Sequence, residues 1–395
     1  MAIISITKFL LVCTGMAALI FAKRAPEVGK RLAGMHTPVA VLAVIFAFAI
    51  SLLWTVVPLP YALNSLAKYG KLIVIVLMLM LIRDRREALY ALYAFVLAQA
   101  FLLASSWLLY LRVPVPWATS DMAQTEYAVF SSYLDQGIMG AVFAAICWHL
   151  RGLAPGRFGR HLAVFAALAS LANVFFVLIG RSGHIAAIAL LSIAIMWELP
   201  KKYRAVVVLL PFLLTLVLFF CSANVEERLM MLKTEIHSYS TQVQTTTSTG
   251  VRLELWRVAL QSIAEHPFGG SGVGSWDIES RRLQLEDNPA IKEIDGTGNP
   301  HQEYLLWGVQ LGIPGILFLF ALMSSVLRDS MKMGKSYARA TQYAILALTT
   351  VCLFNSSLYD AQIGDFFCIV TGLLLALGLR TSSHEAYATP NPSDA

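Results

Sequence analysis

Two arginines and one histidine stand out because each lies at the edge of an apolar segment. Arg181 separates two such segments, Arg252 lies near the start of an amphipathic stretch, and His301 precedes another apolar segment. Guanidinium groups recognise phosphate through paired hydrogen bonds without a metal, and a neutral imidazole accepts a proton. An anion clamp and a base at a bilayer surface suit transfer from a lipid-linked phosphate or pyrophosphate donor.

His301 follows Asn299 and Pro300, a pair that predicts the start of a helix. Asn is a good N-cap, and Pro suits the first helical position because its missing N–H is not needed there. This places His301 in the first turn of a membrane helix. The positive end of the helix disfavours imidazolium, so His301 is expected to be neutral at pH 7. The alternative role is an interfacial histidine that only forms hydrogen bonds.

Arg252 and Trp256 lie four residues apart on a predicted helix over residues 251–265. In the first turn of this helix Arg252 is next to free backbone N–H groups that favour an anion. Trp256 lies one turn further on and can fix the orientation of Arg252. The alternative is an arginine that reaches lipid headgroups at the interface.

Arg181 and Asp360 complete the predicted site. Arg181 lies between two membrane segments with no room for a loop, where a charge usually faces a cavity or a partner. Asp360 lies on the same side, between the last two spans. A substrate role and pairing with a nearby arginine are both open for Asp360.

Other motifs do not point to a cofactor or a metal. The glycine run over residues 269–274 fits neither a dinucleotide-binding fingerprint nor a Walker loop, and is expected to be a tight turn between helices. No Asp-x-Asp occurs, and Glu293-Ile294-Asp295 is a weak metal signal. The five cysteines form no C-x-x-C pair, which argues against a disulfide framework or thiolate metal site.

The composition predicts an all-α polytopic membrane protein. Among 395 residues, 57% are hydrophobic, only 14% are charged, and the mean hydropathy is +0.66, whereas soluble domains carry about 25% charge. Several apolar segments approach the ~20 residues that cross a bilayer. These segments cover residues 4–22, 37–57, 66–82, 88–111, 126–150, 161–180, 184–199, 203–222, 302–327, 339–357 and 362–379.

Basic residues predict the orientation of the spans. Every second loop is rich in Lys and Arg, and such loops face the cytoplasm. The net charge of +6 therefore reflects topology and not nucleic-acid binding. This predicts N-terminal transmembrane helices over 1–222, a large outer loop over 223–301, C-terminal transmembrane helices over 302–380, and a disordered cytoplasmic tail over 381–395. Eleven spans put the N-terminus outside, and a twelfth span remains open.

Three sequence blocks give the chain a family resemblance. They are Gly180-Arg181-Ser182-Gly183; Arg252-x-x-x-Trp256 followed by Glu265-His266-Pro267-Phe268-Gly269 and Gly272-x-Gly274; and His301-Gln302-Glu303-Tyr304-Leu305 with Gly312-Ile313-Pro314-Gly315. In order, spacing and outer placement, from about residue 120 to 380, the chain resembles the O-antigen ligase/polymerase superfamily of bacterial envelope glycosyltransferases. The common His-Asn pair of that family is His301-Gln302 here.

The resemblance implies a GT-C-type architecture and a metal-independent, inverting glycosyltransferase in the inner membrane of a Gram-negative bacterium, with its active site facing the periplasm. Its donor would be an undecaprenyl-pyrophosphate-linked glycan and its acceptor a lipid A–core oligosaccharide, in contact with membrane lipids. Carried over by position, Arg181 and Arg252 hold the pyrophosphate and His301 deprotonates the acceptor hydroxyl. Trp256, Tyr304 and Asp360 are the supporting residues.

Three activities share these motifs: the ligase, the polymerase that extends the glycan on its own carrier, and the protein O-oligosaccharyltransferase. The single dominant outer loop and its amphipathic first helix favour the ligase, whose acceptor is also membrane-anchored. A polyprenyl-linked glycan transporter is an alternative of another class. It would more typically show repeated halves and ionisable residues near mid-membrane, which this sequence lacks.

Overall fold

The computed structural model describes residues 32–200, 202–204, 209–221, 230, 248–287 and 298–388, and every regular element in these residues is a helix. The N-terminal half contains α3 (Thr37–Ile50), η1 (Ser51–Leu53), α4 (Leu59–Tyr69), η2 (Gly70–Leu72), α5 (Ile73–Leu81), α6 (Arg85–Tyr110), α7 (Ala123–Glu126), α8 (Tyr133–Leu150), η3 (Arg151–Leu153), α9 (Gly156–Ala172), the π-helical η4 (Asn173–Val177) and α10 (Arg181–Glu198). The remainder contains α11 (Leu210–Cys221), α13 (Ser248–Glu265), α14 (Trp276–Asp287), α15 (Glu303–Leu311), α16 (Ile313–Ser330), α17 (Lys335–Val351) and α18 (Ala361–Ala388).

Five of the described helical stretches are long and apolar enough to cross a membrane. They are Leu59–Leu81, Arg85–Tyr110, Gly156–Val177, Ile313–Ser330 and Ala361–Thr381; Thr37–Leu53 and Arg181–Trp197 are shorter apolar helices. The chain is therefore an all-α, multi-pass membrane protein, as its composition predicted. The expected first segment, 4–22, lies outside the described residues. The first amphipathic helix of the outer loop, expected from Glu226 to Tyr239 on the spacing of its apolar residues, also lies outside them, apart from Met230.

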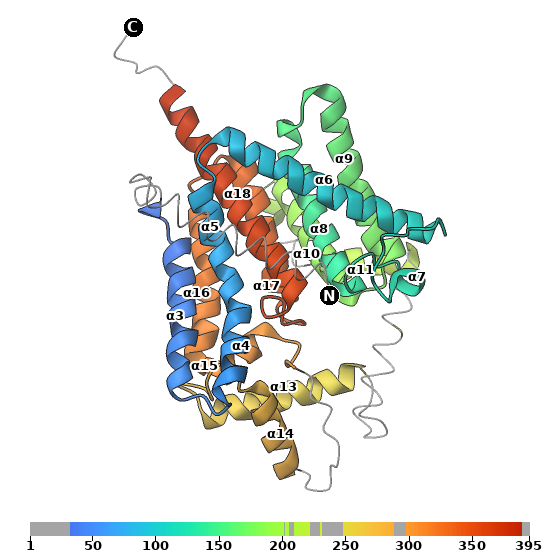
Figure 1. Ribbon diagram of the computed structural model, residues 1–395. Helices are drawn as coiled ribbons and strands as arrows, with labels where there is room; N and C mark the ends of the chain where they lie inside the picture. Colours follow the sequence, from blue (N-terminus) through green and yellow to red (C-terminus); the bar gives the residue numbers. More distant parts are fainter. Residues whose placement is uncertain are drawn as a thin grey trace.

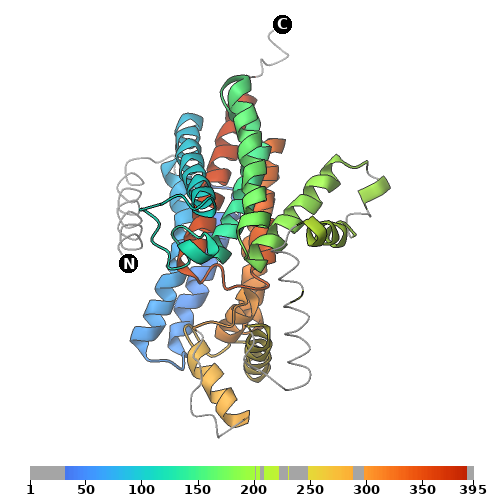
Figure 2. The same cartoon turned by 90° about the vertical axis from the view of Figure 1, so that its right-hand side faces the viewer.

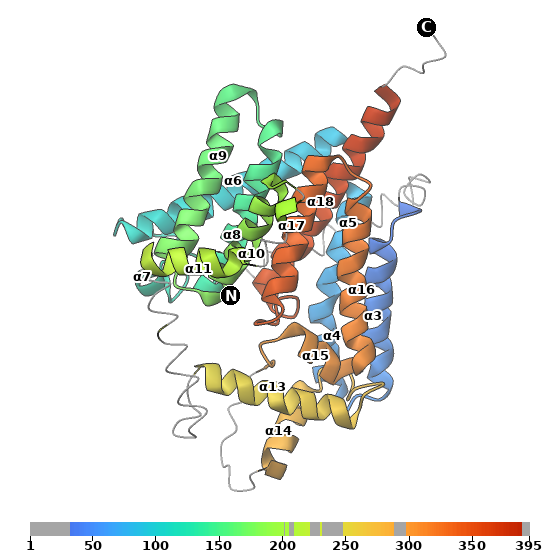
Figure 3. The ribbon, with the colours of Figure 1, turned by 180° about the vertical axis from the view of Figure 1, so that it is seen from behind.

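The two ends of the helical bundle differ in what they carry. The connections α5–α6, α8–α9 and α16–α17 lie at the upper end in Figure 1, while α13 and α14 lie at the lower end. Figure 2 shows the same division from the side. In Figure 3, α13 runs across the lower end of the bundle, beneath α15 and α17. The expected outer-loop helices thus lie at the end opposite the basic connections.

An aromatic cluster fixes the short helix α15 in the core. The side chain of Trp307 is fully buried and meets the rings of Phe48 and Tyr69 edge-on, at centroid distances of 5.0 and 5.7 Å. Gln310, one turn further along α15, donates a hydrogen bond to the Tyr69 hydroxyl at 2.8 Å. Edge-to-face ring pairs contribute beyond their buried area. The start of α15 is therefore held in a defined position relative to α3 and α4.

The glycine run after α13 is a tight turn, as expected, and it packs against backbone on two sides. Gly270 and Gly272 have φ angles of +61° and +86°. A Cβ on Gly270 would lie 2.5 Å from the Gln310 carbonyl carbon, and one on Gly272 would lie 2.3 Å from the Thr55 Cα. Only glycine fits both the dihedral angles and the space. The turn joins α13 and α14 to α15 and to the segment between η1 and α4.

Two expected boundaries differ in the structure. The apolar segment 302–327 is not one helix, because Gly312, with a φ of +70°, ends α15 before α16 begins at Ile313. The last helix also continues to Ala388, so residues 381–388 of the expected disordered tail are helical. Residues 389–395 lie outside the described residues.

Candidate functional site

A cavity of about 300 Å³ lies where α8, α13, the start of α18 and the segment before α15 meet. It brings together Arg252, His301 and Asp360, three of the residues predicted from the sequence. Ligand cavities of roughly 300–1,000 Å³ are typical of small-molecule sites. This one lies at the lower end of that range. The full lining is Ser132, Leu134, Asp135, Arg252, His301, Asn355, Asp360, Ala361 and Gln362.

His301 is not in a helix, which corrects the expectation that Asn299 caps its helix. Helix α15 begins at Glu303, and its N-cap is Gln302, whose side chain accepts a hydrogen bond from the Leu305 N–H at 2.6 Å. The Asn299 side chain instead accepts from the His301 N–H at 2.8 Å. His301 has a φ of +50°, in the left-handed region that is uncommon for a residue with a side chain. Because Gln302 caps α15, His301 lies in the segment that precedes the helix, and it lines the cavity.

Arg252 lies in the second turn of its helix and not the first, because α13 begins at Ser248. The free N–H groups of the helix end therefore are not its immediate neighbours, and its guanidinium itself supplies the positive charge on the cavity wall. Trp256 has a more specific role than orienting Arg252. Its indole Nε1–H donates to the Pro300 carbonyl at 3.1 Å. This bond joins α13 to the peptide that precedes His301.

Asp360 lies in the connection between α17 and α18, which is tied to the His301 segment. Its side chain accepts a hydrogen bond from Asn299 at 3.3 Å, so Asn299 contacts both Asp360 and the His301 backbone. Glu303 is fully buried and accepts from the backbone N–H groups of Leu358 and Tyr359 at 2.8 and 3.2 Å. These contacts fix the spacing between the imidazole segment and the carboxylate.

Burial and neighbouring charges set the protonation of His301 and Asp360. Burial, followed by the positive charge of Arg252, lowers the pKa of His301 below its ordinary value of 6.5. The imidazole is therefore neutral at pH 7, as the sequence predicted, although the cause is not a helix end. Burial raises the pKa of Asp360, and the ammonium groups of Lys71 and Lys68 oppose that rise.

A comparison with known protein families finds a match over part of the chain. Residues 165–320 match the protein family described as O-Antigen ligase. Over this region the chain is similar to the O-antigen ligase family. The matched residues include Arg181, Arg252 and His301, and Asp360 lies outside them. A relative from Haemophilus influenzae, described as an uncharacterized protein, is 31% identical over 100 residues. That alignment covers 25% of this chain and 25% of the relative.

Arg181 and Tyr304 are not on the cavity lining. Arg181 is the first residue of α10; its neighbour Ser182 accepts a hydrogen bond from Asn355, a lining residue, at 3.0 Å. The Tyr304 hydroxyl donates to the Thr349 carbonyl at 3.2 Å, which places this ring in the packing between α15 and α17. The structure thus brings three of the predicted residues together in the cavity, places Arg181 near a lining residue, and places the Tyr304 side chain in helix packing.

Sequence reasoning missed Asp135, a second carboxylate on the cavity wall. Asp135 lies in the first turn of α8, where its N–H donates to the Ser132 side chain at 3.1 Å. Ser132 and Asp135 have the three-residue spacing of a helix start, within a segment otherwise treated as an apolar span. That acidic residue in an apolar segment was the signal that could have identified it.

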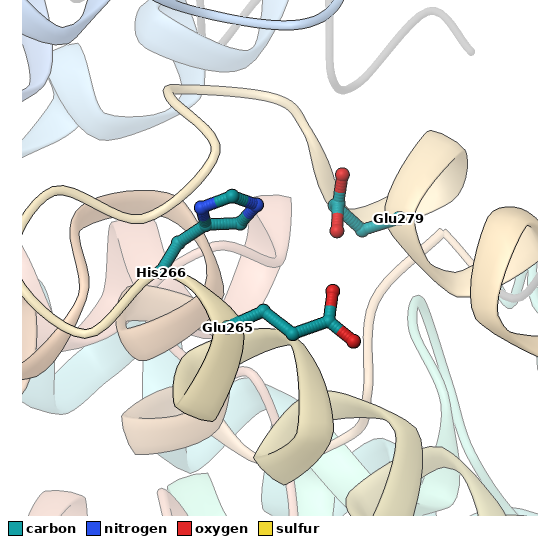
Figure 4. Close-up of side chains that lie close together, drawn as sticks. All are labelled: Glu265, His266 and Glu279. Atoms are coloured by element: carbon teal, nitrogen blue, oxygen red, sulfur yellow. The ribbon is translucent and has the colours of Figure 1, made fainter.

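Glu265, His266 and Glu279 form a cluster whose ligand atoms lie within 4.8 Å of one another (Figure 4). His266 and Glu265 belong to one of the blocks that carry the resemblance. Arg282 pairs with both carboxylates, with a contact of 2.8 Å to Glu279. A cation here would have to displace this guanidinium, so the cluster is best described as an ion-pair network that joins α13 to α14.

Proposed function

We propose that the protein is an O-antigen ligase. It transfers a glycan from undecaprenyl pyrophosphate to a lipid A–core oligosaccharide at the periplasmic face of the inner membrane. The observation that carries the proposal is the cavity in which a neutral, half-buried His301 and the Arg252 guanidinium lie together. A base next to a cation suits a reaction in which a hydroxyl loses a proton and a pyrophosphate leaves.

In the proposed reaction, His301 takes the proton of the acceptor hydroxyl as its oxygen attacks the anomeric carbon. The bond between that carbon and the pyrophosphate oxygen breaks, and the negative charge that develops on the leaving group is stabilised by Arg252 and Arg181. Single displacement inverts the anomeric configuration. Asp360 and Asp135, on the same cavity wall, stabilise the imidazolium that forms and can accept hydrogen bonds from sugar hydroxyls.

The two halves of the site lie on separate elements with rigid supports. Arg252 is carried by α13, and His301 by the segment before α15; the Trp256–Pro300 hydrogen bond holds these elements together. A base and an anion-binding group must keep a fixed separation to act on one substrate. This connection supports a site that is formed before the substrate arrives.

The deciding experiment combines the purified full chain with undecaprenyl-pyrophosphate glycan and rough lipopolysaccharide in the presence of EDTA. Longer lipopolysaccharide is expected with the wild type, and a loss of about 10²–10⁴-fold with His301→Ala, the range of general-base catalysis. His266→Ala is the matched control, because His266 is exposed, near α13 and outside the cavity lining. Normal transfer by His301→Ala would refute the assignment of the base.

The same assay separates the other family activities. Glycan lengthening on its carrier when lipopolysaccharide is omitted would identify a polymerase. Glycan transferred to a pilin-like protein would identify a protein O-oligosaccharyltransferase. Movement of the lipid-linked donor across vesicles without either product would identify a transporter.

A further inference from the structure

A second cavity, of about 370 Å³, lies at the opposite end of α8 from the candidate site. Asp135 and His149 line the two cavities and are 14 positions apart on α8, which corresponds to about 21 Å along the helix axis. The second cavity therefore does not extend the first. Its lining comes mainly from Trp148, His149, Arg151, Arg160, Lys335 and Arg339.

The lining of this basic cavity has four cationic side chains and no acidic one. Arg151 and Arg160 come from the α8–α9 region, and Lys335 and Arg339 from the first turns of α17. Basic loops are expected on the cytoplasmic side of a membrane protein, but that rule requires only their number. The positive-inside rule does not explain why basic residues from two regions almost 200 residues apart in sequence line the same cavity. Converging cations repel one another unless an anion lies between them.

Two buried nitrogen atoms of lining residues, His149 Nε2 and Arg339 Nε, have no hydrogen-bond partner among the residues that the structure describes. A buried polar group without a partner costs free energy, which a bound acceptor would recover. Two of the guanidinium groups lie over aromatic rings. The Cζ atom of Arg339 is 4.7 Å from the ring centroid of Trp197, and that of Arg151 is 4.4 Å from the ring centroid of Trp148. Their positions are thus supported by the protein before any ligand binds.

We propose that the basic cavity binds a phosphate-bearing anion at the membrane face opposite the candidate active site. Arginine and lysine side chains around a cavity between membrane helices can donate charge-assisted hydrogen bonds to the anionic oxygens of phosphate. The ligand is either the headgroup phosphate of an anionic lipid or a free phosphate. This inference is independent of the transfer reaction, because neither His301 nor Arg252 takes part in it.

Native mass spectrometry of the purified full chain with phosphatidylglycerol, phosphatidylcholine or inorganic phosphate tests the proposal. Phosphatidylglycerol or inorganic phosphate is expected to bind, with phosphatidylcholine at least about tenfold weaker.

Arg160→Gln/Arg339→Gln should weaken anion binding about tenfold or more. The second double variant, Arg160→Gln/Lys335→Gln, changes only exposed side chains and leaves the Arg339–Trp197 contact in place. It should also weaken anion binding about tenfold or more. The matched control is Arg157→Gln/Arg328→Gln, which removes the same charge from exposed positions outside the cavity.

The arms of the experiment assign the source of the anion. Displacement of phosphatidylglycerol by inorganic phosphate supports a free anion, and retention of the lipid supports a headgroup site. Equal binding of phosphatidylglycerol and phosphatidylcholine without phosphate binding would overturn the proposal. Equal weakening in the control variant would also overturn it, because the residues would then act only through overall charge.

Discussion

At the scale of single residues, the backbone of His301 is the most telling feature of the candidate site. A left-handed φ of +50° costs energy for a residue with a side chain, and such conformations persist where surrounding contacts enforce them. Here the enforcing contacts are the Asn299 side chain and the hydrogen bond from Trp256 to Pro300. Both hold the imidazole on the cavity wall beside Arg252.

The pH dependence of transfer tests the pairing of His301 with Arg252. The pKa of His301 lies below 6.5, so the imidazole is still neutral when the pH is lowered slightly from 7. Activity should fall only when the pH drops through that lowered pKa, because the imidazole is then protonated and can no longer accept a proton. Arg252→Gln removes a positive charge, so the pKa should rise and the acid limb of the residual activity should move to higher pH. Arg252→Lys keeps the charge but loses the paired hydrogen bonds, so most activity should disappear with the limb unmoved. The measurement is the pH–rate profile of kcat/KM for the wild type and both variants. If the acid limb of Arg252→Gln lies at the same pH as that of the wild type, Arg252 does not influence the pKa of His301.

Trp256→Phe tests the hydrogen bond that joins α13 to the His301 segment. The substitution keeps an aromatic ring but removes the donor, at a cost of about 1 kcal/mol, or roughly fivefold in kcat. The matched control is Trp54→Phe, which also loses a 3.1 Å hydrogen bond, from its indole to the Gly269 carbonyl, away from the cavity. We expect kcat to fall only in Trp256→Phe; equal kcat in both variants would assign Trp256 to packing alone.

At the scale of elements, short helix α15 connects the core to the candidate site. Its aromatic residue Trp307 is fixed against α3 and α4, and its first residue, Glu303, accepts hydrogen bonds from the α17–α18 connection. The same carboxylate accepts from the Trp307 indole at 2.7 Å. One buried side chain therefore sets the distance between the segments that carry His301 and Asp360.

Glu303→Ala should destabilise the protein and disrupt the cavity. It leaves the Trp307, Leu358 and Tyr359 donors buried without an acceptor, and each such group costs about 1–3 kcal/mol. Thermal unfolding in detergent should show a clearly lower Tm. Glu303→Gln keeps an acceptor oxygen and should have an intermediate Tm. A Tm for Glu303→Ala equal to that of the wild type would refute this role.

Gly272→Ala tests the turn that packs α13 against the rest of the chain. The added Cβ meets the Thr55 backbone and adopts an unfavourable φ, at an expected cost of about 2–4 kcal/mol. Gly70→Ala is the control, since a Cβ there has nothing within 4 Å and the φ is −54°. Thermal unfolding should separate the two variants; similar Tm values would show that the turn tolerates a side chain.

At the scale of the whole molecule, the two cavities lie at opposite ends of α8, and the basic connections lie at the end away from α13 and α14. The positive-inside rule then predicts that the basic cavity faces the cytoplasm and the candidate active site faces the periplasm. One molecule would bind phosphate groups at both faces.

Cysteine labelling tests this orientation. In a background without the native cysteines, Ala264→Cys on α13 and Arg157→Cys on α9 each place a thiol at an exposed position. A membrane-impermeant maleimide applied to intact spheroplasts should label the α13 position and not the α9 position, and lysis should expose both. The reverse pattern would invert the topology and contradict a periplasmic site.

Sequence was sufficient to predict the helical membrane class and to select three residues that line the candidate cavity. Apolar length and the scarcity of charge require membrane spans, because backbone groups in lipid must be satisfied within helices. Arg252, His301 and Asp360 could be selected because ionisable side chains are costly beside apolar segments. These inferences depend on local composition, which the sequence contains in full.

Tertiary structure alone decided how these residues are held and which others join them. The sequence placed His301 in a helix through Asn299, but the capping side chain is Gln302, and Asn299 is used by the His301 backbone and by Asp360. Asp135 joins the cavity only because α8 packs near the α17–α18 connection. Such partners are far apart in sequence, and local patterns do not encode which helix ends will meet.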